Sequence, residues 1–179
     1  MRAEDILYFW FTEAGPDRWW RKSDDFDALI KRQFLNLYEQ AARGELAAWR
    51  LSERGRLAEI LVLDQFPRNM FRGHARSFAA DVSALILAQE AVAQAVGAHW
   101  NADWLQFLYM PYMHSESLGV HDEAVLLFSG AGLENNLDFE HRHRNIIKRF
   151  GRYPHRNEIL GRKSTDAEIA FLKEPGSGF

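Results

Sequence analysis

The sequence predicts an all-α fold with no β-sheet, and three observations indicate this. Apolar residues recur at spacings of three and four almost throughout the chain, which is the period of an amphipathic helix. No run alternates β-branched residues with polar ones, as a half-buried strand would. Glycine or proline falls just past most of the periodic segments, where a helix commonly ends. We expect one domain over residues 1–179.

The helical period places the elements in order at residues 3–13, 24–43, 45–49, 55–64, 81–96, 103–110, 117–129, 133–150, 154–160 and 166–172. Thr165 and Glu168 form a T-x-x-E capping box that starts the last of these helices. Two apolar faces are expected to meet the core, and they carry Phe26, Ile30, Phe34, Leu37 and Ala41 in one helix and Val82, Leu85, Ile86, Ala93 and Val96 in another.

Composition excludes several classes of protein. The chain has no cysteine, which rules out disulfides and thiolate chemistry and fits a reducing compartment. The apolar run near the N-terminus is short and follows two acids, unlike a signal peptide. No apolar stretch approaches the roughly 20 residues that a membrane helix needs. We expect a cytoplasmic protein without a membrane partner.

Charge is unevenly distributed along the chain. Residues 141–163 contain eight lysines and arginines but one acid, Glu158, so this stretch is +7 and the rest of the chain is −10, for a total of −3. A nucleic acid is not the expected partner, because the acidic remainder would repel a phosphate backbone. The basic stretch is expected to bind a small anion or to pair internally with acidic helices.

Three turns fixed by proline carry polar side chains. Pro67 is expected to stop one helix and place Arg68 and Asn69 in a turn. Pro111 is expected to break an aromatic helix just before the sequence HSE, residues 114–116. Pro154 is expected to start a new helix with free N–H groups in its first turn. Rigid elements that end in polar turns commonly build a pocket.

The residue types in these turns indicate acid–base chemistry on an anionic ligand. His143 lies on the apolar face of helix 133–150. Histidine titrates near neutrality, and a carboxylate can orient it or act as its paired acid or base. The candidate catalytic residues are His114, Glu116, His143 and His155. The planar guanidinium of arginine can donate two hydrogen bonds to a carboxylate or phosphate, and side-chain amides can donate one. The candidate ligand-binding residues are Arg68, Asn69, Arg152, Arg156 and Asn157. The remaining histidines, at positions 74, 99, 121 and 141, are expected at the surface.

Each of these residues also has a purely structural interpretation. A buried histidine is more often satisfied by a neighbour than functional, arginines can join acidic helices, and Glu116 can cap the next helix. A divalent metal among the histidines and Glu116 is an alternative, but no H-E-x-x-H motif or repeated E-x-x-H pair supports it. We therefore assign no metal, and the sequence indicates no particular cofactor.

Several long motifs resemble a known family. LDQFPRNMFRG, PYMHSE, HRNIIKRFGRYPHRNEILGRKST and the closing FLKEPGSGF are similar to the bacterial family called domain of unknown function 924, and the similarity covers the chain from ILYFWF onward. The resemblance implies antiparallel helix pairs packed like a tetratricopeptide array, although no 34-residue period is readable. It implies no activity. The polar positions shared with the family are Asp64, Gln65, Arg68, Asn69, His114, Glu116, His143, Arg152, His155, Arg156 and Asn157.

Two functions remain open at this point. The first is an enzyme or a binding protein that holds a small anionic ligand, a carboxylate or phosphate, in a pocket lined by these histidines, arginines and Glu116. The second is a tetratricopeptide-like interaction module whose arginines form a concave surface for an acidic peptide. We favour the first, because a peptide groove has less need of a histidine on the inner face of a helix.

Overall fold

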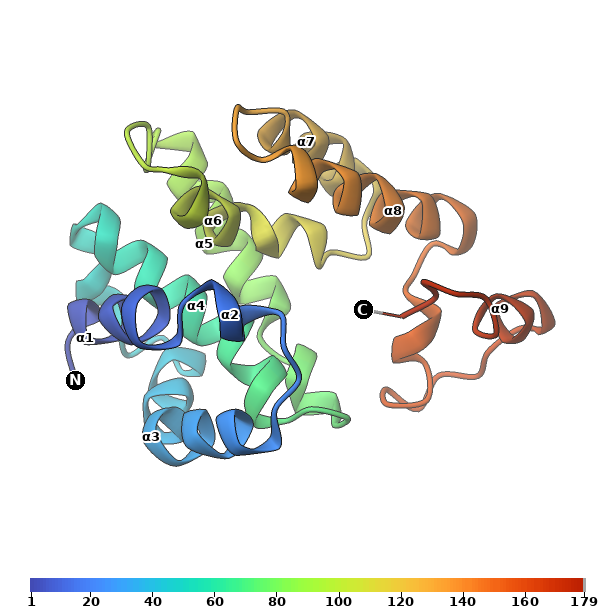
Figure 1. Cartoon of the computed structure of the whole chain (residues 1–179), viewed down its shortest axis with the longest axis horizontal. Coiled ribbons are helices and arrows are strands. Elements are labelled where there is room, and N and C mark those ends of the chain that lie inside the picture. Colours follow the sequence, from blue (N-terminus) through green and yellow to red (C-terminus); the bar gives the residue numbers. More distant parts are fainter. Residues whose placement is uncertain (179) are drawn as a thin grey trace.

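The computed structural model of the protein describes residues 1–178, and Phe179, the last residue of the closing motif, lies outside that range. Within it every regular element is a helix or a helical turn and there is no strand, which confirms the predicted all-α class (Figure 1). The α-helices are α1 (Ala3–Tyr8), α2 (Pro16–Trp19), α3 (Asp24–Ala42), α4 (Glu53–Met70), α5 (Asp81–Ala93), α6 (Ala102–Met113), α7 (Leu118–Phe128), α8 (Glu134–Phe150) and α9 (Asp166–Phe171). A π-helix spans Phe9–Ala14, and 3₁₀ turns span Ala47–Leu51, Ala75–Phe78 and Pro154–Arg156.

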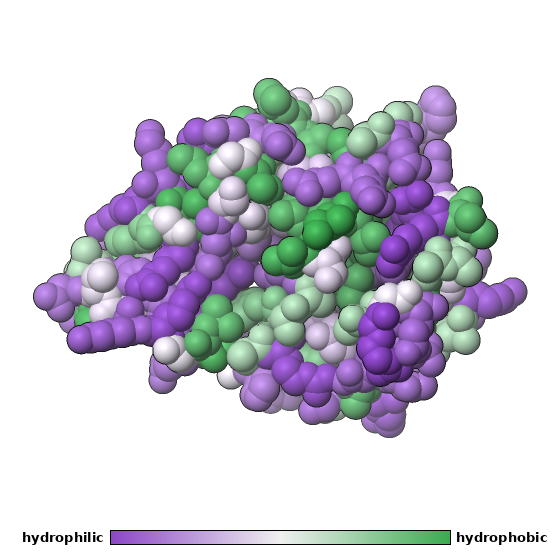
Figure 2. All heavy atoms as spheres, turned by 180° about the vertical axis from the view of Figure 1, so that it is seen from behind, coloured by the Kyte–Doolittle hydropathy of each residue, from purple (hydrophilic) through white to green (hydrophobic). Residues whose placement is uncertain are grey.

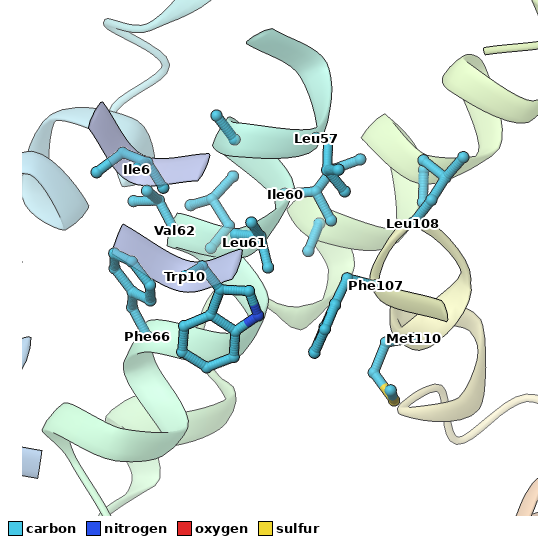
Figure 3. Packing of buried hydrophobic residues seen from close by; sticks show 14 of the residues in the cluster. Ile6, Trp10, Leu57, Ile60, Leu61, Val62, Phe66, Phe107, Leu108 and Met110 are labelled. Carbon is cyan, nitrogen blue, oxygen red and sulfur yellow. The ribbon is translucent and has the colours of Figure 1, made fainter. Parts of the chain in front are cut away.

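α4 is the central helix, and α1, α3, α5 and α6 pack around it. Every residue from 57 to 67 is buried. The rings of Trp10, Phe66 and Phe107 meet beside α4, with centroids 5.7 Å apart for Trp10 and Phe66 and 5.5 Å apart for Trp10 and Phe107 (Figure 3). Aromatic pairs at such distances add about 0.5–1.5 kcal/mol to the gain from burying their area.

The two prolines expected to end helices lie inside them instead. α4 continues through Pro67 to Met70, and α6 continues through Pro111 to Met113. Each proline lacks one helical N–H, but both residues are buried, and the packing around these helices outweighs the local cost. Arg68 and Asn69 therefore lie on the last turn of a helix rather than in a loop.

Two further expectations were wrong. Val82 and Ile86 do not face the core but are 70% and 50% exposed, while Ala84 and Ala88 are fully buried. The segment DVSALILAQEAVA is apolar nearly all round, so its periodicity does not single out one face. Residues 154–160 do not form one continuous helix. The chain passes from the 3₁₀ turn Pro154–Arg156 into further turns, and a hydrogen bond of 2.7 Å from the N–H of Arg162 to the backbone oxygen of Asn157 closes them.

The C-terminal part of the chain packs on the end of α8. α8 ends at Gly151 with φ of +70°, the left-handed conformation that glycine adopts without a Cβ penalty. α9 starts at the predicted capping box of Thr165 and Glu168. Phe171 of α9 then joins a small apolar cluster with Ile147 and Tyr153, separate from the main core.

The surface is mixed in character. In the view of Figure 2, hydrophobic side chains gather over the middle of the molecule, and hydrophilic ones dominate toward its C-terminal end. Throughout residues 1–178, none of the helices has both the length and the apolar character needed to cross a bilayer.

Candidate functional site

A cavity of about 250 Å³ lies between the 3₁₀ turn Ala75–Phe78, the start of α5, the end of α6 and the C-terminal turns. Its walls are mostly apolar and include Phe78, Val82, Leu85, Pro111 and Leu160. Its polar side chains are Asp81, His114, Ser115, Glu116 and Arg156. An apolar hollow with a few polar groups is the usual form of a small-molecule site, and this one falls just below the roughly 300–1,000 Å³ of drug-sized pockets.

His114 is oriented by a buried carboxylate. Because α6 runs through Pro111, His114 is the residue that follows the last helical turn, and its side chain is 15% exposed. Its Nδ1 lies 2.7 Å from Oδ1 of Asp64 on α4. Gln65 donates to the other oxygen of Asp64 at 2.6 Å. Asp64 thereby fixes the ring, and within residues 1–178 Nε2 of His114 makes no hydrogen bond.

The charge states of this pair follow from its surroundings. Burial alone would raise the pKa of Asp64, but the contacts with His114 and Arg68 outweigh it and hold that pKa at about 2. Burial, with the nearby charge of Arg68, lowers the pKa of His114. At neutral pH Asp64 is therefore a carboxylate and His114 a neutral ring. The proton of that ring lies on Nδ1, facing Asp64, so Nε2 carries a lone pair.

Two arginines share one carboxylate at the edge of the cavity. Arg68 and Arg156 both contact Asp81, the first residue of α5, with N–O distances of 3.0 and 3.1 Å. Arg156 also donates to the backbone oxygen of His114 at 3.0 Å. Its guanidinium lies between the rings of Phe78 and Tyr153, at 4.4 and 4.7 Å from their centroids. Among the described residues its Nε has no partner.

Glu116 lines the cavity, but both of its oxygens are engaged. Oε1 accepts from the backbone N–H of Tyr153 at 2.7 Å, and Arg162 donates to both oxygens at 2.7 and 2.9 Å. Burial opposes ionisation of Glu116, but the bonds from Arg162 and Tyr153 keep its pKa lowered. Glu116 therefore attaches the C-terminal turns to the segment that carries His114. The sequence had not singled out Arg162.

His143 and His155 lie beside this site without lining the cavity. Both rings contact Tyr153, with centroids 5.7 and 5.6 Å away. Nδ1 of His143 donates to the oxygen of Phe139 at 2.8 Å. Burial lowers the pKa of His143 to about 3 and that of His155 to about 4, so both are neutral near pH 7.

Three of the predicted ligand-binding residues make contacts away from the cavity. Asn69 donates to Asp27 at 2.8 Å. Arg152 donates to both oxygens of Glu168, at 2.7 and 2.8 Å, and supports α9. Asn157 is fully buried and bonds the C-terminal turns internally. Of the residues singled out from sequence, His114, Glu116 and Arg156 thus line the cavity, and Arg68 lies behind them.

His121 was expected at the surface, and that expectation was wrong. It is fully buried, with Nδ1 2.6 Å from Oε1 of Glu140 and Nε2 2.9 Å from the oxygen of Ser115. The sequence did hold a signal for this. His121, Ala124 and Phe128 are spaced by three and four and share one helical face, and all three are fully buried.

Two other features of the structure are weaker candidates for a functional site. In the part of the chain that the structure describes, no three histidine or acidic side chains are placed together to hold a metal ion. A larger, shallower hollow of about 710 Å³ lies along α1 and the π-helix. Four of its charged groups already pair with one another, Arg54 with Glu4 and Arg2 with Asp5.

The chain is similar to a solved structure of a protein of unknown function from Agrobacterium tumefaciens, with 39% identity, 96% of each chain covered and a TM-score of 0.89. The comparison with curated proteins found no match. The model of the bacterial protein family of unknown function DUF924 matches residues 6–176, and the chain therefore belongs to that family.

Proposed function

We propose that the protein binds a small monocarboxylate in the His114 cavity, with the apolar body of the ligand against Phe78 and Leu85. The observation that carries this is the pairing of a buried Asp64 with His114, which leaves the lone pair of Nε2 as an acceptor at a mostly apolar cavity. A hydroxyl or N–H of the ligand would donate to Nε2.

The charges around the cavity disfavour a doubly charged ligand. Arg68 and Arg156 are already matched by Asp64 and Asp81, and Glu116 is matched by Arg162. A doubly charged phosphate would therefore find no unmatched cation. A carboxylate carries only one negative charge, and Arg156, which lines the cavity, is the guanidinium proposed to donate to it.

The same arrangement suits general-base chemistry. Asp64 holds the proton of Nδ1 and so sets the tautomer in which Nε2 can take a proton from a bound molecule. An enzymatic role for His114 extends the binding proposal and depends on it.

The alternative function, a tetratricopeptide-like module for an acidic peptide, needs arginines that are free to meet acidic side chains. Most arginines of the basic stretch instead pair within the chain: Arg142 with Asp138, Arg144 with Asp122, Arg152 with Glu168 and Arg162 with Glu116. This internal pairing favours the small-molecule proposal.

The test is a thermal-shift screen with small monocarboxylates, hydroxy acids, inorganic phosphate and an acidic peptide. The informative variant is His114→Asn, whose amide can still donate to Asp64 but lacks the Nε2 acceptor. Arg152→Ala is the control, because Arg152 lies outside the cavity.

We expect a monocarboxylate to stabilise the wild type and the Arg152 variant equally. Binding to His114→Asn should be weaker by roughly tenfold, the loss of one hydrogen bond to a partly buried group. Equal stabilisation of all three proteins, or a response to phosphate or the peptide alone, would contradict the proposal.

A further inference from the structure

Side chains of other elements hold the segment that carries His114. Carbonyl groups at the end of a helix and just past it have no partner within the helix, and three in succession, from the last residue of α6 into the turn that follows, accept bonds from buried side chains. The oxygen of Met113 accepts from the Tyr153 hydroxyl at 2.6 Å. The oxygen of His114 accepts from Arg156 at 3.0 Å, and that of Ser115 lies 2.9 Å from Nε2 of His121.

The position of the proton on His121 can be deduced from its neighbours. The oxygen of Ser115 can only accept, so Nε2 of His121 must carry hydrogen to make a favourable contact at 2.9 Å. The Tyr153 hydroxyl, 3.1 Å from Nε2, already donates its hydrogen to Met113. His121 therefore uses Nε2 as a donor and presents Nδ1 to Glu140.

A second proton must lie between His121 and Glu140. Their facing atoms, Nδ1 and Oε1, are 2.6 Å apart, and two lone pairs at that distance would repel each other. The pair thus holds one proton in common and has no net charge. This suits a site where both side chains are fully buried. Burial raises the pKa of Glu140, and His121, His141 and Arg144 act in the opposite direction.

We propose that His121 and Glu140 are positioning residues for the His114 site. The shared proton keeps Nε2 of His121 a donor, and that donor fixes the Ser115 carbonyl and so the turn from which His114 reaches Asp64. Glu140 acts through His121, and neither side chain lines the cavity. This inference gives the pair a role in the proposed binding function and therefore rests on it.

Two substitutions of one residue test the role of His121. His121→Gln keeps an N–H that can reach the Ser115 oxygen, whereas His121→Leu fills the same space without a donor. NMR of the full-length chain reports on His114 directly, because ring nitrogens with and without hydrogen have distinct ¹⁵N shifts and the ring protons follow its titration. No ligand is needed, so failure of this inference is distinguishable from failure of the binding proposal.

In the wild type we expect neutral His114 to carry its proton on Nδ1 and to titrate below 6.5. In His121→Leu the titration midpoint should rise toward 6.5 as the turn loosens, and the preference for one tautomer should weaken. His121→Gln should restore both properties. An unchanged His114 in a folded His121→Leu protein would overturn the proposal.

The wild type supplies a second measurement in case His121→Leu does not fold. The ring of His121 must show hydrogen on Nε2, and one strongly deshielded proton should belong to its contact with Glu140. In Glu140→Gln, whose amide can donate to Nδ1, that proton should vanish while His114 remains as in the wild type. If Nε2 of His121 carries no hydrogen in the wild type, the inference is refuted without any variant.

Discussion

At the scale of single residues, Asp64 has the largest predicted effect on stability. It is fully buried and contacts both His114 and Arg68. Asp64→Ala should lower the free energy of unfolding by about 3–5 kcal/mol, because it leaves buried donors without their carboxylate. Urea denaturation measures this. Asp138→Ala is the control: Asp138 pairs with Arg142 where both side chains are 61% exposed, and its loss should cost under about 0.5 kcal/mol. Similar losses for the two would contradict the assigned role.

Buried histidines predict how stability depends on pH. The pKa of His143 is about 3 when folded and 6.5 ordinarily, so between these values the unfolded chain binds more protons. The free energy of unfolding should be highest above pH 6.5 and fall as pH drops toward 3, by up to about 1.4 kcal/mol per pH unit for this residue.

His143→Gln should therefore make the pH dependence shallower in urea denaturation measured across this range. His141→Gln, on the exposed side of the same helix, should leave the slope unchanged. Parallel slopes for all three proteins would show that His143 is not buried in neutral form.

At the scale of elements, two glycines in helices predict opposite effects of alanine. A Cβ on Gly55 of α4 would lie 2.0 Å from the backbone oxygen of Trp49. Gly55→Ala should thus destabilise the protein by about 1–3 kcal/mol, although alanine favours helices by about 1 kcal/mol. A Cβ on Gly119 of α7 would meet nothing closer than 3.9 Å, so Gly119→Ala should stabilise it by about 0.5–1 kcal/mol. Denaturation midpoints that move in the same direction would contradict this comparison.

The ion pair of Arg152 and Glu168 contributes to the attachment of α9, together with the packing of Phe171. Arg152 joins Glu168 and also donates to the oxygen of Lys163 at 2.9 Å. We expect Arg152→Ala to raise amide hydrogen exchange in α9 and leave α4 protected, because the packing of α4 does not involve this pair. Exchange that rises equally in both helices would show a global loss of stability instead.

At the scale of the whole molecule, Arg156 connects the C-terminal turns to α5 and α6 through Asp81 and the His114 oxygen. Arg156→Ala should lower the melting temperature without any ligand. The loss should be near the lower end of the roughly 3–5 kcal/mol for breaking a buried pair, since Arg68 still contacts Asp81.

If residues 1–178 form one cooperative unit, circular dichroism and tryptophan fluorescence should give coincident unfolding curves in the wild type. In Arg156→Ala the two curves are then expected to separate, with helix loss beginning before the tryptophan-rich core opens. Coincident curves and an unchanged melting temperature in the variant would show that Arg156 is dispensable for this connection.

Local rules predicted what depends on local sequence. The all-α class, the end of α8 at Gly151 and the start of α9 at Thr165 followed from periodicity, a left-handed glycine and a capping box, which involve residues a few positions apart. The same rules failed at Pro67 and Pro111. There, both prolines and most of the residues around them are buried, and packing holds the helices against a local preference.

By itself the sequence determined the residue types of the candidate site, since His114, Glu116 and Arg156 were all singled out from it. The tertiary structure decided their partners. Asp64 is 50 positions from His114, and Asp81 is 75 positions from Arg156. Periodicity within one element carries no information about contacts over such distances. The packing of α4, α5 and α6 brings these groups together, and it sets which charges are matched and which nitrogen of His114 remains available.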